Sequence, residues 1–157
     1  MAALNAFWCK PMTTASSVCE LCQGDGGELL FQGDHYRVVL VDDADYPGFC
    51  RVICSAHSKE MTDLPAPERA ALMEAVWAVE VAVRTVMQPE KVNLASLGNM
   101  TPHVHWHVIP RYLDDVHFPG PIWSEPKRVA VAQLQAQRRA LLPALRLAVA
   151  QQLQARG

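Results

Sequence analysis

Three histidines that alternate with apolar residues constrain this chain more than any other feature. They stand at every second position, as His103, His105 and His107. Val104 and Trp106 fill the places between them. Alternation of this kind is typical of a half-buried strand, in which successive side chains point to opposite faces. We therefore expect a strand within residues 103–112, with the imidazoles on one face and the apolar side chains in the core. Pro110 is expected to end it, because proline has no N–H for the ladder.

The rest of the chain predicts an α+β fold. Short apolar runs bounded by turn residues predict four more strands, over residues 28–32, 36–41, 49–54 and 91–97. Helical spacing predicts one long helix over 68–87, with Thr62 or Asp63 as its N-cap. The last thirty residues read as helical, broken or kinked at Pro143. Short connections between the strands predict an antiparallel sheet of about five strands, with the long helix packed on one face and helices at the C-terminus.

Composition narrows the classes of function. A net charge of −2 and the lack of a basic patch argue against nucleic-acid binding, and no apolar run is long enough to span a membrane. Five cysteines without a convincing signal peptide predict reduced thiols in a cytoplasmic protein. We expect three segments: an N-terminal arm over 1–18, a domain over 19–112, and a loop with a C-terminal helical extension over 113–157.

Three uses of the histidine row compete. It could hold a metal ion, supply a nucleophile, or form a polar sheet face without chemistry. Alternate residues of a strand stand roughly 6.5–7 Å apart, so three imidazoles reach one metal only if the strand bends. No carboxylate lies within the row to act as a base for metal-bound water. Phosphate chemistry fits better, with His105 attacking phosphorus through one ring nitrogen and His107 donating to phosphate oxygens.

The segment 103–109 resembles the motif of the histidine triad (HIT) family, His-φ-His-φ-His-φ-φ, in which φ is hydrophobic. The similarity extends over roughly residues 19–112 and is that of a bacterial-type HIT domain. It includes a Cys-x-x-Cys pair, a strand ending in His57, one long helix, Asn93 ahead of Gly98-Asn99, and Pro110-Arg111 after the triad. The resemblance implies a small α+β domain that forms a homodimer and binds purine nucleotides.

The same resemblance implies a nucleotidyl hydrolase or transferase. It would cleave nucleoside-monophosphate phosphoramidates or dinucleoside polyphosphates through a covalent intermediate between His105 and AMP. His107 would contact the non-bridging phosphate oxygens, and His103 completes the triad. Many relatives carry Ser or Thr five residues before the nucleophile to protonate the leaving group, but this chain has Met100 there, with Thr101 beside it. That departure motivates an alternative, a purine-nucleotide-binding regulatory module with little turnover.

Five further residues are candidates for nucleotide contacts. The acidic loop lies where the family places a carboxylate on the ribose, which implicates Asp42 first and Asp43 next, although both could equally be turn residues. Asn93 would bind phosphate or the histidine strand, and Asn99 is a second candidate. Phe49 stands where relatives often have histidine, and would form an apolar wall of the base pocket.

The cysteine pair Cys19-x-x-Cys22 is on its own a modest sign of half a zinc site, and two free thiols are the alternative. A thioredoxin-like redox role is disfavoured, because no βαβ unit follows the pair. By resemblance to a zinc-binding subset of the family, the ligands of a structural Zn²⁺ would be Cys19, Cys22, His57 and His103. His103 would then serve the metal, while His105 and His107 serve phosphate.

Overall fold

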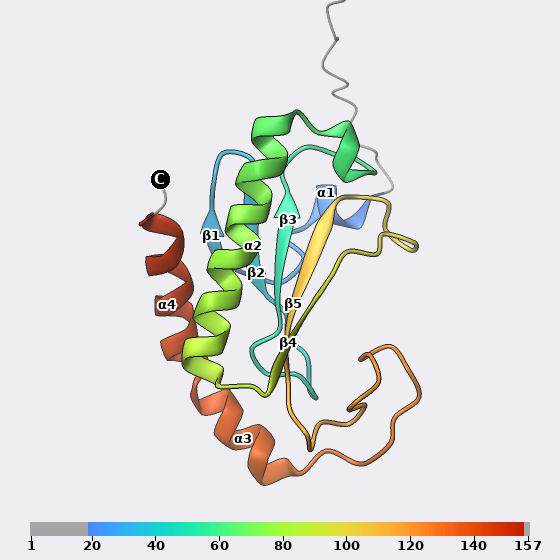
Figure 1. The fold of residues 1–157 in the computed structure, drawn as a ribbon, viewed down its shortest axis with the longest axis vertical. Coiled ribbons are helices and arrows are strands. Elements are labelled where there is room, and N and C mark those ends of the chain that lie inside the picture. The colour runs from blue at the N-terminus through green and yellow to red at the C-terminus, as the bar shows by residue number, and fades with distance from the viewer. Residues whose placement is uncertain (1–18, 156–157) are drawn as a thin grey trace, which may run out of the picture.

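A five-stranded antiparallel sheet, in the order β1-β2-β3-β5-β4, forms the framework of the molecule (Figure 1). The computed structural model describes residues 19–155, so the expected arm over 1–18 lies outside the described residues. In chain order the elements are α1 (Glu20–Gln23), β1 (Glu28–Gln32), β2 (Tyr36–Leu40), β3 (Cys50–Cys54), the 3₁₀ helix η1 (Met61–Asp63), α2 (Ala66–Met87), β4 (Lys91–Ala95), β5 (His105–Arg111), α3 (Ala132–Ala140) and α4 (Leu142–Gln154).

One face of the sheet is covered by α2, and α4 packs against α2 and β1 (Figure 1). The main core lies between these layers, where Val76 and Val83 of α2 meet Val52 of β3 and Val108 of β5. The apolar side chains between the histidines point into this core, as the alternation predicts. The imidazoles of β5 therefore face the opposite side of the sheet, which no long helix within residues 19–155 covers. The α+β fold expected from the sequence is confirmed.

Both ends of β5 differ from the expectation, and the role given to Pro110 is wrong. The strand begins at His105, so His103 precedes it, with its N–H donating to the carbonyl of Thr101. Pro110 does not end the strand but lies within it, paired with Val92 of β4. Pairing with β3 stops at Val108, so at Pro110 a neighbouring strand flanks only one side of β5. A missing N–H is tolerated where one side of the ladder is vacant.

The helix ends also differ in detail. Helix α2 begins at Ala66 with Pro65 as its N-cap residue, so neither Thr62 nor Asp63 caps it. Asp63 is instead engaged in η1, where its carboxylate accepts the N–H of Glu60. At the other end of the chain, Pro143 lies in the first turn of α4 and separates that helix from α3, so it breaks the helix rather than kinking it. Among the described helices none is both long and apolar enough to cross a membrane.

Candidate functional site

His105 is presented from the first position of β5, with 8% of its surface exposed. Its Nδ1 lies 2.6 Å from the backbone carbonyl oxygen of His103. A carbonyl only accepts hydrogen bonds, so this contact places the ring proton on Nδ1 and leaves the lone pair on Nε2. The ring lines a cavity of about 270 Å³ on the open face of the sheet. His105 is thus fixed in one tautomer with a nucleophilic nitrogen available.

His107 lies beside His105 on the same face, with ring centroids 4.8 Å apart and the planes nearly perpendicular. Burial, with the neighbouring His105 and Arg51, lowers the pKa of His107 to about 4. Burial also lowers the pKa of His105, although its bond to the His103 carbonyl opposes that change. Both rings are therefore neutral at neutral pH, the state in which an imidazole can attack phosphorus.

Four segments complete the cavity wall. Glu20 comes from α1, Arg51 from β3, and residues 97–101 from the connection between β4 and β5. Trp123 comes from the loop after β5, and its ring lies 5.2 Å from that of His107. Asn99 lines this cavity, so the structure brings that predicted residue to the two histidines.

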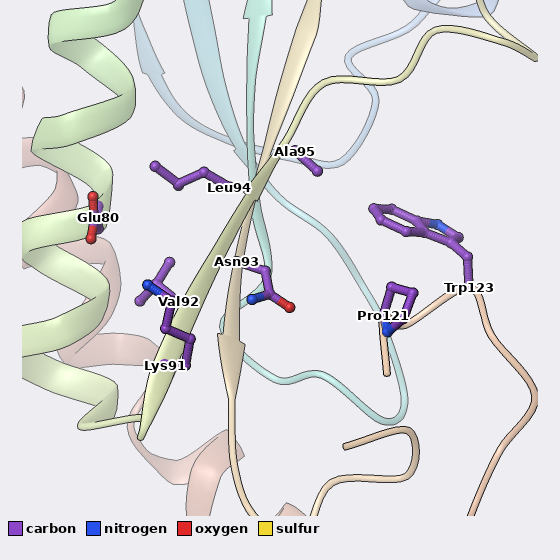
Figure 2. Close-up of a pocket in the computed structure, with 8 residues that line it drawn as sticks. All are labelled: Glu80, Lys91, Val92, Asn93, Leu94, Ala95, Pro121 and Trp123. Carbon is purple, nitrogen blue, oxygen red and sulfur yellow. The ribbon is translucent and has the colours of Figure 1, made fainter. Parts of the chain in front are cut away.

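Phe49 and Asn93 lie close to the histidine row without lining this cavity. The Phe49 ring is 5.5 Å from the His107 ring, a position compatible with the predicted apolar wall. Asn93 accepts a hydrogen bond of 2.5 Å from Arg111. It also lines an adjoining hollow of about 430 Å³, with Trp123 at the opposite side (Figure 2).

Asp42 and Asp43 are not among the residues that line the cavity with His105. Asp43 Oδ1 accepts the N–H groups of Asp45 and Tyr46 at 2.9 and 3.0 Å, which is the turn role. Asp42 is exposed, and both aspartates line a separate hollow with Arg139. The ribose contact of this loop stays a prediction, and the carboxylate of Asp43 is already engaged by its own backbone.

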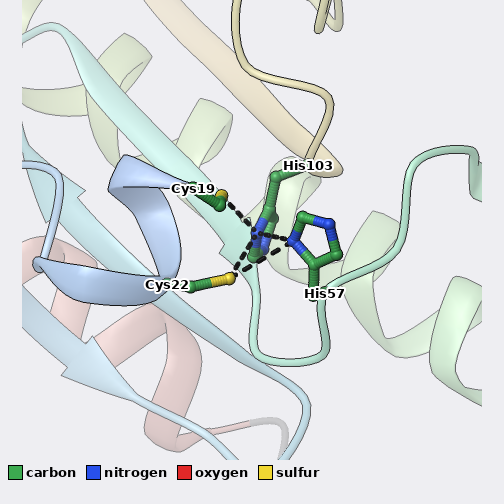
Figure 3. A group of neighbouring side chains, drawn as sticks. All are labelled: Cys19, Cys22, His57 and His103. Carbon is green, nitrogen blue, oxygen red and sulfur yellow. Dashed lines mark hydrogen bonds between the residues drawn. The ribbon is translucent and has the colours of Figure 1, made fainter. Parts of the chain in front are cut away.

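The four predicted metal ligands lie together on the same side of the sheet (Figure 3). His103 Nδ1 lies 3.5 Å from the sulfur of Cys19 and 3.5 Å from that of Cys22. His57 Nδ1 is 3.3 Å from the Cys22 sulfur and 3.4 Å from His103 Nδ1. Tetrahedral Zn²⁺ with bonds of about 2.3 Å to sulfur and 2.0–2.1 Å to nitrogen separates its ligands by about 3.3–3.8 Å. These residues therefore fit a metal ion.

His103 joins this cluster to the histidine row. Its Nε2 lies 2.8 Å from the carbonyl oxygen of Cys54, the kind of outer contact that orients a metal-binding imidazole. Its own carbonyl holds His105 Nδ1. The ring of His103 thus contacts the thiols, while its backbone carbonyl orients the nucleophile.

The loop after β5 is held by a buried ion pair. Arg111, 2% exposed, donates to Asp115 at 2.7 and 3.0 Å and to the carbonyl oxygen of Gly120 at 2.7 Å. Asp115 also accepts the N–H groups of His117 and Phe118. These bonds fix the loop against β5, and so set the place of Trp123 beside His107.

The cavity includes three residues that the sequence did not predict, Arg51, Trp123 and Glu20. Arg51 carried one available signal, as the single charged residue in the otherwise apolar run of β3. Trp123 carried a weaker one, as an aromatic residue in a loop rich in proline and glycine. Glu20 gave no signal, because its hydrogen bond with Thr101 joins residues 81 positions apart.

The fold and the site define a class, a small α+β domain that presents paired imidazoles from one strand beside a cluster of two thiols and two imidazoles. The chain belongs to the HIT family, since the model of the HIT domain matches residues 26–114. Among curated proteins no sequence matches this chain.

Solved histidine triad proteins share this fold. One from Bradyrhizobium japonicum is 26% identical, with a TM-score of 0.66, and the match covers 80% of this chain and 92% of that one. One from Marinobacter aquaeolei is 27% identical over the same shares, with a TM-score of 0.63. A zinc-bound histidine triad family protein from Mycobacterium smegmatis is 21% identical, with a TM-score of 0.56, and the match covers 82% of this chain and 88% of that one.

Proposed function

We propose that this protein is a nucleotidyl hydrolase or transferase that cleaves nucleoside-monophosphate phosphoramidates or dinucleoside polyphosphates. The observation that carries the proposal is the His105 ring, which lines the cavity with Nδ1 fixed to a carbonyl at 2.6 Å. Membership in the HIT family supports it.

The reaction divides into two displacements at phosphorus. In the first, the lone pair of His105 Nε2 forms the N–P bond while the bond from phosphorus to the leaving group breaks. The leaving group takes the bond pair, and a strongly basic leaving group also takes a proton from water. In the second, water attacks phosphorus, the N–P bond breaks, and AMP leaves as the water proton is released. His107 contacts the non-bridging oxygens, where negative charge develops.

The competing function is a nucleotide-binding regulatory module with little turnover. The residue five positions before His105 favours this function, because the Met100 side chain cannot donate a proton and is 95% exposed. The neighbouring Thr101 hydroxyl already donates to Glu20 at 2.7 Å. If the protein is an enzyme, it should turn over fastest those substrates whose leaving groups need no proton.

Trapping of the intermediate separates the two functions. The protein is incubated briefly with adenosine 5′-phosphoramidate, quenched, and measured by intact mass spectrometry. The enzyme predicts a nucleotidyl adduct in the wild type and in the control His35→Ala, whose histidine is exposed. It predicts no adduct in His105→Ala. Tight AMP binding without adduct or turnover in the wild type would instead establish the module.

We propose a structural Zn²⁺ held by Cys19, Cys22, His57 and His103. The contacts of 3.3–3.5 Å among their ligand atoms support it. The zinc-bound family protein from Mycobacterium smegmatis supports it as well. Such an ion would tie the segment that carries α1 to the sheet. A catalytic metal held by all three triad histidines is disfavoured, because His103 Nδ1 points to the thiols while His105 Nδ1 is held by a carbonyl. Metal analysis of purified protein finding no zinc would remove the site.

We further propose that the protein is a cytoplasmic homodimer whose partner molecules are purine nucleotides. Trp77 and Val81, one turn apart on α2, expose 47% and 40% of their surfaces, which supports an interface there. The edge strand β4 offers a second unpaired border. Sedimentation equilibrium should give about twice the chain mass of 17.4 kDa, and a monomer mass at all concentrations would contradict the dimer.

A further inference from the structure

Arg51 is a charged side chain in the middle of a buried strand. Its neighbours in β3 are buried, yet Arg51 is only half-buried, because its side chain turns to the open face and lines the cavity. It pairs directly with His107 across the β3–β5 ladder, so the two side chains share that face. The Arg51 guanidinium therefore lies on the same face of the sheet as the two imidazoles.

This guanidinium makes no direct ion pair, although the charges of Glu20 and Asp43 act on it from a greater distance. Its Nη1 makes one long hydrogen bond, 3.4 Å to the carbonyl oxygen of Gly26, and its Nε is buried without a partner. Within residues 19–155, no carboxylate oxygen lies within ion-pair distance of Arg51. By contrast Arg111, Arg138 and Arg146 each pair with a carboxylate at 2.7 Å. A partly buried charge without a carboxylate in direct contact is costly, and a bound anion would lower that cost.

The cavity has no other source of positive charge among its described lining residues. Arg51 is the one lysine or arginine among the described residues that line it. Glu20 brings the opposite charge, and its carboxylate accepts the Thr101 hydroxyl while attracting Arg51 from beyond ion-pair distance. An incoming phosphate would thus be attracted by Arg51 alone, and a guanidinium fork matches phosphate oxygens two at a time.

The Arg51 side chain extends over Phe49 and toward the loop that precedes β1. The central carbon of its guanidinium lies 5.6 Å from the centre of the Phe49 ring, and its Nη1 reaches back to Gly26, ahead of β1. The phosphorus that reacts must meet His105 and His107. An anion bound at the end of the Arg51 side chain that reaches Gly26 would therefore be a different group of the same ligand.

We propose that Arg51 binds a second phosphate of the nucleotide, so that the site selects nucleotides with two phosphates over simple monophosphates. This selectivity rests on the proposed function, since it assigns the substrate class of the same cavity. The second phosphate can belong to a phosphoanhydride chain or to the ribose, and the two sources share the same chemistry at Arg51.

Binding measurements test the selectivity without any turnover. Titration calorimetry compares AMP, α,β-methylene-ADP and adenosine 3′,5′-bisphosphate on the wild type, Arg51→Gln and Arg51→Lys. In the wild type we expect at least one of the two diphosphates to bind about tenfold more tightly than AMP. In Arg51→Gln that ratio should fall to about one, and Arg51→Lys should restore part of it. The control is Arg84→Gln, the same change at an exposed site on α2, which should keep the wild-type ratio.

Each result of the titrations leads to a different conclusion. Preference for α,β-methylene-ADP assigns Arg51 to the phosphoanhydride chain, and preference for the bisphosphate assigns it to the ribose. Equal affinity of all three ligands in the wild type, or a ratio that survives in Arg51→Gln, overturns the role of Arg51 but leaves the proposed function standing. If none of the three binds, both proposals fall. Thermal unfolding of each variant checks that the fold is intact.

Discussion

At the scale of single residues, His107 links the site to the pH dependence of stability. Its pKa falls from 6.5 to about 4 through burial, with contributions from His105 and Arg51. The unfolded chain therefore binds a proton near pH 6.5, whereas the folded chain binds it only near pH 4. The free energy of unfolding must decrease as pH falls through this window. We expect His107→Gln to remove about 2.5 kcal/mol of the change between pH 7 and pH 4.5, measured by urea unfolding.

The control for that experiment is His35→Gln, because His35 is exposed. Its pH dependence should match that of the wild type. An unchanged slope in His107→Gln would show that the ring already titrates normally in the folded protein.

Gln88 supplies a second prediction at this scale. It ends α2 in the left-handed region, with φ of 48°, and is the one non-glycine residue among the described residues with positive φ. Glycine adopts this conformation without a steric penalty. We expect Gln88→Gly to raise the free energy of unfolding by up to about 1 kcal/mol and Gln88→Ala to leave it lower than Gln88→Gly. Equal stability of the two variants would contradict the role of φ.

At the scale of elements, the Arg111–Asp115 pair holds the loop after β5. Replacing Arg111 with Met leaves the Asp115 carboxylate buried without its counterion, and we expect a loss of about 3–5 kcal/mol in the free energy of unfolding. Limited proteolysis should then cut the loop over residues 113–126 faster. The control is Arg146→Met, which breaks an ion pair of the same 2.7 Å length between exposed partners. It should cost less than about 1 kcal/mol.

A second variant keeps this prediction informative. Combining Arg111→Met with Asp115→Asn removes both charges, so much of the lost stability should return. If the double variant is no more stable than Arg111→Met, the packing of the loop, and not the uncompensated charge, dominates its attachment.

The strands show what local sequence can predict. Each strand proposed from apolar runs is present, since alternation and turn residues are local signals. The ends were less certain because they depend on neighbours. Pro110 stays in β5 because β3 stops pairing at Val108, and Asp63 fails to cap α2 because η1 uses its carboxylate. Neither neighbour can be deduced from the residues themselves.

The candidate site was also predicted only in part. The motif predicted His105 and His107, and the resemblance predicted a metal set that gathers residues from 19 to 103 in one place. Arg51 and Trp123 were not predicted, because they reach the site through strand pairing and loop placement. Arg51 meets His107 through strand pairing, and Trp123 meets it through a loop fixed by Arg111.

At the scale of the whole molecule, the cysteine–histidine cluster connects the N-terminal segment to the sheet. If the proposed zinc is bound there, its removal costs folding free energy. We take the zinc to contribute about 3 kcal/mol to the free energy of unfolding. Each kcal/mol shifts the melting temperature of a domain of this size by about 2–4 °C, so we expect a strong chelator to lower it by about 10 °C. The secondary structure below the transition should persist, since the core between α2 and the sheet does not contain the four ligands. Calorimetry and circular dichroism measure the two effects.

Cys22→Ser should reproduce the chelated state and no longer respond to chelator. An unchanged melting temperature after verified removal of zinc would contradict a structural role. Immediate loss of activity in chelator with an unshifted melting temperature would instead indicate a catalytic metal.

His103 has a consequence for how such domains can diverge. The bond that orients His105 uses the backbone oxygen of residue 103, which every amino acid possesses, whereas the cluster uses its imidazole. A related protein with another side chain at this position can therefore lose the metal site, while the ring proton of its catalytic histidine stays on Nδ1. Loss of one capacity need not entail loss of the other, even though both reside at a single position.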